Sequence, residues 1–336
     1  MHRILSRFSL ALAAPFLAAL SLATLLFPGS ALAEPYPTKP ITEIVPFAAG
    51  GPTDIVARIA GEHMAKVLGQ QIVIENVAGA GGTTGITRGA QATADGYTIM
   101  MGHMGTHAAA PALYPKLKYD PTKDFEPIGL VAGTPIVIVA KKNFPAANLK
   151  EFIAYLKANQ AKVNEAHAGV GSVSFTSCSL FNSQLGIKPT RVAYRGTGPA
   201  VNDLISGQVD YMCDQIVNVS EQIKGGAIKA FAIATPQRSA ALPDVPTTKE
   251  AGLPEYQVSA WNALFAPKGT PKEIVAKLND ALSKALDDPG TSKRLLDLGG
   301  VLPDKAGRTP DALRELVKKE VARWTPILKA TGAEGS

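Results

Sequence analysis

Cysteine, aromatic residues and charge are all scarce in this sequence, and each scarcity excludes a class of protein. The 336 residues include two cysteines, so neither a multi-disulfide scaffold nor a multi-cysteine zinc module is available. Charged residues make up 18% and aromatic residues 6%, and no basic cluster is interleaved with aromatics, which argues against nucleic-acid binding. Glycine (31) and proline (25) follow no period, which excludes collagen-like and coiled-coil architectures. What remains is a globular α/β chain long enough for two domains.

The first 33 residues differ from the rest and have the pattern of a secretory signal peptide. Arg3 and Arg7 precede an apolar stretch that runs from Phe8 to Phe27, and a small-residue A-x-A pattern ends at Ala33. An uncleaved anchor is the alternative, because this stretch is longer than usual, but Pro15 within it favours cleavage after Ala33. Cleavage would leave 303 of the 336 residues and, with two arginines lost, would lower the formal charge from +6 to +4. We therefore expect an exported chain with a mild preference for small anions.

The two cysteines, Cys178 and Cys213, would then lie in an oxidising compartment. Both lie in apolar settings, in Thr176-Ser177-Cys178 and Tyr211-Met212-Cys213. They either form a disulfide or remain as small buried thiols, and both alternatives stay open at this point.

Short β-branched runs alternate with helical patterns along the rest of the chain. Ile41–Phe47 predicts a strand and Pro52–Leu68 an amphipathic helix, and the alternation returns after Leu149. Apolar strands joined by helices favour mostly parallel sheets flanked by helices, here in two lobes between which the chain crosses twice. Thr270 and Thr309 each precede a further helix. Other strands are predicted at Gln71–Val77, Tyr97–Met101, Ile128–Val131, Ile136–Ala140, Glu165–Ala168, Arg191–Tyr194, Val209–Asp214 and Ile228–Ala234, and other helices at Leu149–Asn159, 174–185, Pro199–Ser206 and 218–224.

One segment has the pattern of an anion-binding turn. A predicted strand runs into Gly50-Gly51, and Pro52 follows where the first residue of a helix tolerates a missing N–H. Free backbone N–H groups at such a helix N-terminus attract a carboxylate or phosphate. Asp54 is expected to cap the helix more naturally than to touch an anion, and a glycine turn that binds nothing is the alternative interpretation. The candidate ligand-binding residues here are Phe47, Ala48, Ala49, Gly50, Gly51, Pro52, Thr53 and Asp54.

Three further loops of small residues also follow predicted strands. Ligands bind beyond the carboxyl ends of the strands in open α/β sheets, so loops from both lobes are expected to line one cleft. Arg195 is expected to pair with a ligand carboxylate, with an inter-element salt bridge as the alternative. The candidate ligand-binding residues of these loops, and of the strand end that faces them, are His103, Thr106, His107, Gly171, Ser172, Ser174, Phe175, Arg195, Gly196, Thr197 and Asp214.

Motifs for catalysis and metal binding are missing or incomplete. The sequence has no G-x-S-x-G nucleophile elbow and no P-loop, and Gly79–Gly85 is not a G-x-G-x-x-G dinucleotide-binding motif. We expect that glycine-rich turn to pack between elements of the lobes. His103 and His107 have the spacing of a helical metal site, but Gly105 lies between them and no third ligand adjoins. The sequence thus predicts no catalytic residue, no metal and no cofactor.

These segments together resemble the solute-binding receptors of tripartite tricarboxylate transporters, also called Bug or TctC-like proteins. The resemblance implies a two-lobed periplasmic binding protein of type II (Venus flytrap) fold, without catalytic activity. It also implies a carboxylate ligand held between the lobes by Ala48–Asp54 and Gly169–Ser174, and delivery of that ligand to integral membrane transporter subunits. The matching stretches are Pro46–Arg58, Asn76–Gly85, Asp95–Ile99, Tyr119–Phe125, Tyr194–Asp210, Ile228–Val258, Trp261 and Phe265–Pro271.

One pair of residues departs from the family pattern. After Gly171-Ser172 the family often has His-Leu, whereas this sequence has Phe175-Thr176. The departure implies a more apolar cleft on the second lobe, and with the mild positive charge it favours an aromatic or dicarboxylic acid as ligand.

The expected domain boundaries place lobe 1 at residues 34–135 and 258–336, and lobe 2 at residues 136–257. We expect a monomer. Two other functions stay open: a ligand-sensing adaptor for a membrane signalling partner, and a secreted hydrolase.

Overall fold

The computed structural model describes residues 36–332, so the predicted signal peptide at 1–33 lies outside the described residues. The described strands form one mixed sheet in the order β2-β1-β3-β9-β4-β7-β5-β6, with β8 beside β4. The strands are β1 (Ile41–Val45), β2 (Ile72–Asn76), β3 (Thr98–His103), β4 (Phe125–Lys141), β5 (Asn164–His167), β6 (Thr190–Ala193), β7 (Tyr211–Gln215), β8 (Ile228–Ile233) and β9 (Ser259–Pro267). The α-helices are α2 (Pro52–Leu68), α3 (Thr83–Ala90), α4 (Ala110–Leu113), α5 (Leu149–Asn159), α6 (Val173–Leu185), α7 (Thr197–Ser206), α8 (Ile216–Lys224), α9 (Lys272–Asp287), α10 (Pro289–Asp297) and α11 (Pro310–Thr331).

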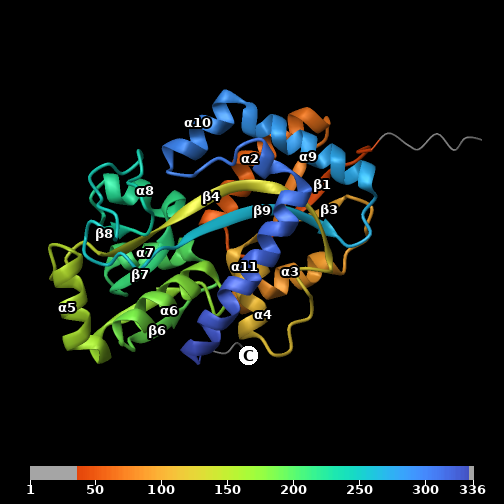
Figure 1. Cartoon of the computed structure of the whole chain (residues 1–336). Coiled ribbons are helices and arrows are strands. Elements are labelled where there is room, and N and C mark those ends of the chain that lie inside the picture. The colour runs from red at the N-terminus through yellow and green to blue at the C-terminus, as the bar shows by residue number, and fades with distance from the viewer. Residues whose placement is uncertain (1–35, 333–336) are drawn as a thin grey trace, which may run out of the picture. The chain divides into compact units, whose positions relative to one another are not determined.

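The long strand β4 belongs to both halves of this sheet. Its residues 125–135 pair with β9, and its residues 136–141 pair with β7 and β8. We call the half with β1, β2, β3 and β9 lobe 1, and the half with β5 to β8 lobe 2; Figure 1 shows β4 and β9 side by side in the middle of the fold. The parallel pairs are β1–β2 and β1–β3 in lobe 1 and β5–β6 and β5–β7 in lobe 2. The predicted α/β fold class is confirmed, and antiparallel pairing by β4, β8 and β9 makes the sheet mixed.

Several predicted element boundaries are wrong. The sequence predicts two separate strands at Ile128–Val131 and Ile136–Ala140, but β4 is continuous, because the intervening residues 132–135 pair in regular register with β9. Helices α7 and α8 both begin two residues before the predicted starts, at Thr197 and Ile216. Strand β9 and helices α3, α4 and α10 are not among the elements predicted from the sequence.

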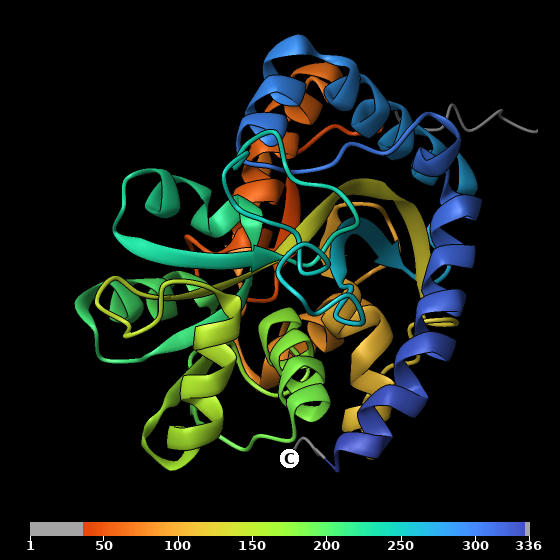
Figure 2. The same ribbon diagram turned by 60° about the vertical axis from the view of Figure 1, so that its left-hand side comes forward.

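The C-terminal helix α11 packs against elements of both lobes. It contacts β4 and α4, and it also contacts α6 (Figure 2). Its Trp324 is fully buried and donates an indole N–H to Glu320 Oε2 at 3.1 Å, so the polar edge of the ring is satisfied inside the core. In the part of the chain that the structure describes, no helix combines the length and apolarity needed to cross a membrane.

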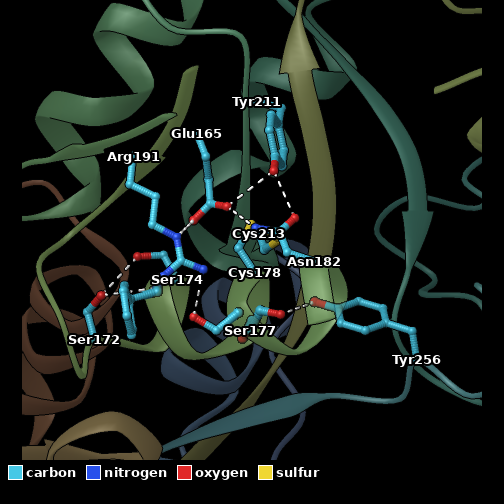
Figure 3. The surroundings of a disulfide bond; sticks show 12 residues. Glu165, Ser172, Ser174, Ser177, Cys178, Asn182, Arg191, Tyr211, Cys213 and Tyr256 are labelled. Carbon is cyan, nitrogen blue, oxygen red and sulfur yellow. Dashed lines mark hydrogen bonds and ion pairs between the residues drawn. A yellow bond between two sulfur atoms is a disulfide. The ribbon is translucent and has the colours of Figure 1, made fainter. Parts of the chain in front are cut away.

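The two cysteines form a disulfide in lobe 2. Cys178 of α6 and Cys213 of β7 have Cα atoms 5.3 Å apart, and both side chains are buried (Figure 3). This settles the alternative that the sequence left open. Beside the disulfide, Tyr211 donates a hydrogen bond to Asn182 at 2.9 Å, so a second contact also joins β7 to α6.

Candidate functional site

A small buried cavity lies where strands of both lobes end. The lining residues follow the carboxyl ends of β1, β3, β5, β6 and β7, which is where open α/β sheets bind ligands. Its volume is about 10 Å³, room for about one water molecule. The lining residues are Phe47, Gly51, Pro52, Thr53, His103, Ala168, Ser172, Val173, Ser174, Thr197, Asp214 and Gln215.

Four helix N-termini converge on this cavity. Lobe 1 supplies the start of α2, where Gly51 is the N-cap and Pro52 the first helical residue. Lobe 2 supplies the starts of α6, α7 and α8, with Ser172, Gly196 and Gln215 as the N-caps. Unpaired backbone N–H groups and aligned peptide dipoles make each start favourable for an anion.

Asp54 holds the lobe 1 turn in place. Its Oδ2 accepts hydrogen bonds from the Gly50 N–H at 2.9 Å and from Arg58 Nε at 3.0 Å, and its Oδ1 accepts one from Asn76 Nδ2 at 2.9 Å. Burial opposes ionisation, but these hydrogen bonds, led by that from Arg58, hold the pKa of Asp54 below its usual value. Asp54 does not line the cavity, and α2 has no side-chain cap: instead of capping the helix as expected, Asp54 accepts the N–H of Gly50, the residue before the N-cap.

The rest of the lobe 1 turn contacts lobe 2 instead of the cavity. The Ala48 N–H donates to the Arg195 carbonyl oxygen at 3.1 Å. Ala48, Ala49 and Gly50 are absent from the cavity lining, and the latter two are exposed. Of the eight candidates in this segment, the structure therefore brings four to the cavity: Phe47, Gly51, Pro52 and Thr53.

His103 is the histidine that lines the cavity. Its ring stacks on Phe47 with centroids 5.0 Å apart, and its Nδ1 accepts a hydrogen bond from the Thr106 N–H at 3.1 Å. That hydrogen bond leaves the ring proton on Nε2, so the imidazole offers the site a donor. Burial lowers the pKa of His103 to about 4, which keeps the ring neutral near pH 7.

His107 and Thr106 lie behind His103 in the core of lobe 1. The His107 ring stacks on Phe265 with centroids 4.0 Å apart, and its Nδ1 lies 3.0 Å from Thr106 Oγ1. Neither residue lines the cavity, although both were candidates. His103 ends β3, whereas Thr106 and His107 belong to the helical turn at residues 105–109 that follows it.

On lobe 2, the serines of the α6 start face the cavity and the phenylalanine does not. Ser172 caps the helix by accepting the Phe175 N–H at 3.2 Å, and Ser174 Oγ accepts the Ala168 N–H at 3.0 Å. The Phe175 ring packs against His167, centroids 5.1 Å apart, and against the Arg191 guanidinium at 4.7 Å. The expectation that Phe175 makes the cleft more apolar is therefore wrong, because the first turn of α6 directs its side chain to β5 and β6.

The remaining lobe 2 candidates fall into two groups. Thr197 and Asp214 line the cavity as expected, whereas Gly196 and Gly171 are absent from its lining. Arg195 is exposed and lines a separate surface pocket near Gly81 and Val170, so the structure does not bring its side chain to the cavity.

Three lining residues are not among the sequence candidates: Ala168, Val173 and Gln215. Gln215 Oε1 accepts hydrogen bonds from Thr134 Oγ1 of β4 at 2.6 Å and from Asn262 Nδ2 of β9 at 2.9 Å. With its oxygen so engaged, the side-chain amide of Gln215 has its NH₂ group left to donate. The sequence predicts that α8 begins at residue 218, two residues too late, and therefore does not indicate that Gln215 lies at a helix start.

Close backbone contacts join the lobes on both sides of the cavity. A Cβ at Gly81 would lie 1.7 Å from the Val170 carbonyl oxygen, and a Cβ at Gly198 would lie 2.9 Å from the Gly50 carbonyl carbon. Tyr114 also donates its hydroxyl to the Val170 carbonyl at 2.7 Å. The expectation that Gly79–Gly85 packs between lobe elements is confirmed at Gly81.

Glu43 of β1 is a buried acid behind the α2 start, and its titration is expected to change stability. Burial, followed by the charge of Asp54, raises its pKa to about 8, while Arg58 opposes the shift. The folded state therefore holds a proton that the unfolded state releases above its ordinary pKa, so stability falls as the pH rises from about 4.5 toward 8.

Glu43→Gln removes this loss. The free energy of unfolding of the variant, measured with urea, is expected to gain about 2 to 3 kcal/mol on the wild type between pH 5.5 and pH 7.5. The exposed Glu255→Gln variant serves as the control and should keep a constant difference. A Glu43→Gln difference that is the same at both pH values would contradict the assignment of a buried, protonated acid.

Comparison with known proteins finds a matching family model and similar sequences. The family model described as tripartite tricarboxylate transporter family receptor matches residues 56–333. A protein of Agrobacterium vitis, described as a UPF0065 protein in the TAR-I ttuE-ttuC' intergenic region, is 42% identical over 317 residues, which are 94% of this chain and 91% of the relative.

Two solved structures are also similar. MatC from Rhodopseudomonas palustris with bound malate has 52% sequence identity and a TM-score of 0.85, over 87% of this chain and 100% of that chain. The periplasmic binding protein BugD has 43% identity and a TM-score of 0.86, over 89% of this chain and 99% of that chain.

Proposed function

Because this chain belongs to the tripartite tricarboxylate transporter receptor family, we propose that it is a periplasmic solute-binding protein that captures a small dicarboxylate and delivers it to membrane transporter subunits. The observation that carries the ligand class is the convergence of four helix N-termini on one buried cavity. We propose no catalytic role.

The proposed ligand lies with one carboxylate against the start of α2. Gly51 and Thr53 belong to that start, and Ser172 and Thr197 come from helix starts on the other lobe. Such groups replace part of the water shell of a carboxylate. Since Phe175 faces away, a short aliphatic acid suits the cavity better than an aromatic one. The malate bound by MatC is of this class.

Closure of the lobes is the proposed capture step. A cavity of about 10 Å³ is too small for a dicarboxylate to enter in the arrangement observed, so the ligand enters with the lobes further apart. The ligand favours the closed state because only there does it contact both lobes. We propose residues 34–135 and 258–336 as lobe 1 and residues 136–257 as lobe 2, joined at the residue of β4 where the pairing partner changes.

Calorimetric titration of the purified protein with malate, succinate, citrate, benzoate and glucose tests this function. We expect a short aliphatic dicarboxylate to bind with a Kd on the order of micromolar, about −8 kcal/mol. Glucose should not bind. Ser172→Ala should weaken binding, whereas Ser183→Ala, on an outer face of the same helix, should not. Binding of glucose, or of no acid in the panel, would contradict the proposal.

A further inference from the structure

Asp214 is the acidic residue among those that line the cavity, whereas the helix starts and His103 offer hydrogen-bond donors. It ends β7, is 1% exposed and lines the cavity. Three lobe 2 helix starts surround it, and His103 faces the same space from lobe 1 with a neutral ring whose Nε2 carries the proton. A carboxylate ligand is attracted by every one of these groups except Asp214.

The two oxygens of Asp214 are in different environments. Oδ2 accepts a hydrogen bond from Asn218 Nδ2 in the first turn of α8, and the backbone N–H of Gln215 and the hydroxyl of Thr197 lie close to the carboxyl group. Oδ1 is buried and accepts no hydrogen bond among the described residues. A buried acceptor without a donor is costly, and such groups in folded proteins normally have a partner. A partner for Oδ1 is therefore expected from the ligand.

We infer that Asp214 makes this site select carboxylates that carry a hydrogen-bond donor, a hydroxyl or an ammonium group, on the carbon next to the bound carboxylate. The inference rests on the proposed function and narrows its substrate class. A plain dicarboxylate leaves Oδ1 without a partner and brings a second negative charge toward Asp214. A 2-hydroxy or 2-amino acid supplies the missing donor while its carboxylate occupies the helix starts.

The protonation state of Asp214 sets the conditions of the test. Burial raises its pKa to about 7, opposed first by the hydrogen bond from Asn218. Binding is therefore measured at pH 8, where the carboxylate form predominates. The other titratable residue in the cavity wall, His103, has a pKa of about 4 and stays neutral there.

The test compares ligands that differ by one group: succinate, the two enantiomers of malate, and L-aspartate. In the wild type, one malate enantiomer or aspartate is expected to bind at least about 10-fold more tightly than succinate, and the preferred member tells hydroxyl from ammonium. In Asp214→Asn this ratio should fall below about threefold. The exposed acid variant Asp244→Asn should keep the wild-type ratio.

The ratio, and not the absolute affinity, is the readout, because a general weakening of the fold would change both ligands alike. Equal or tighter binding of succinate by the wild type would overturn the inference without needing any variant to fold. An unchanged ratio in Asp214→Asn would overturn it as well. Failure of every dicarboxylate to bind the wild type would instead overturn the proposed function, and this inference with it.

Discussion

Replacing Gly81 with alanine is expected to weaken dicarboxylate binding on the order of 100-fold while leaving the protein folded. Gly81 has a φ of +61°, and a Cβ at this position would lie 1.7 Å from the Val170 carbonyl oxygen of lobe 2. A backbone oxygen cannot move aside as a flexible side chain can, so the lobes must stay apart. The ligand then contacts the α2 start but loses the three helix starts of lobe 2.

The matched control is Gly226→Ala. Gly226 has a φ of +65°, close to that of Gly81, but no atom lies within 4 Å of the place that a Cβ would take there. Both variants therefore bear the same backbone cost, about 1 kcal/mol, and differ in the clash between lobes. Calorimetry gives the affinities, and urea unfolding checks the fold. Affinities of Gly81→Ala and Gly226→Ala within threefold of each other would contradict the proposed closure.

Removing the disulfide is expected to lower the free energy of unfolding by about 4 kcal/mol. Cys178 and Cys213 are 35 residues apart in the sequence. A disulfide stabilises the fold mainly by restricting the unfolded chain, and this effect grows with the number of residues between the two cysteines. The bond also ties α6, which carries Ser172 and Ser174 near its start, to β7, which carries Asp214. Ligand affinity is therefore expected to fall along with stability.

The double variant Cys178→Ala/Cys213→Ala is compared with the wild type under full reduction, because the reduced wild type keeps both sulfur atoms. The double variant and the reduced wild type should have nearly the same unfolding midpoints in heat and in urea. The remaining difference should be the small effect of removing the two sulfur atoms. A reduced wild type with two titratable thiols and an unchanged unfolding midpoint would show that the bond does not stabilise the fold.

The lobe 1 turn could be predicted from the sequence because its chemistry is local, although only four of its eight candidate residues line the cavity. Gly50-Gly51 followed by Pro52 marks both the end of a strand and the start of a helix, so the turn and its N–H groups could be placed without knowing the fold. The position of Asp54 three residues after the N-cap predicts a cap of the helix, but its carboxylate accepts the N–H of Gly50, one residue before the N-cap.

The lobe 2 half was harder to predict because its residues are brought together by packing. Glutamine is not a preferred N-cap residue, and α8 begins directly after β7 without a loop, so no local pattern marks Gln215 as a site residue. Its orientation depends on Thr134 and Asn262, which are distant along the chain. Likewise, the sequence neighbours of Phe175 and Arg195 predict that both residues face the cleft, but the direction of each side chain is set by tertiary contacts.

A crystal structure of the complex with the tightest-binding dicarboxylate would decide whether helix starts from both lobes hold a carboxylate between them. We predict a carboxylate group within hydrogen-bond distance of the α2 start, at Gly51 to Thr53, and of Ser172 or Thr197 on lobe 2. A ligand bound elsewhere, for example in the surface pocket of about 590 Å³ beside Thr83 and Tyr114, would contradict this mode of binding.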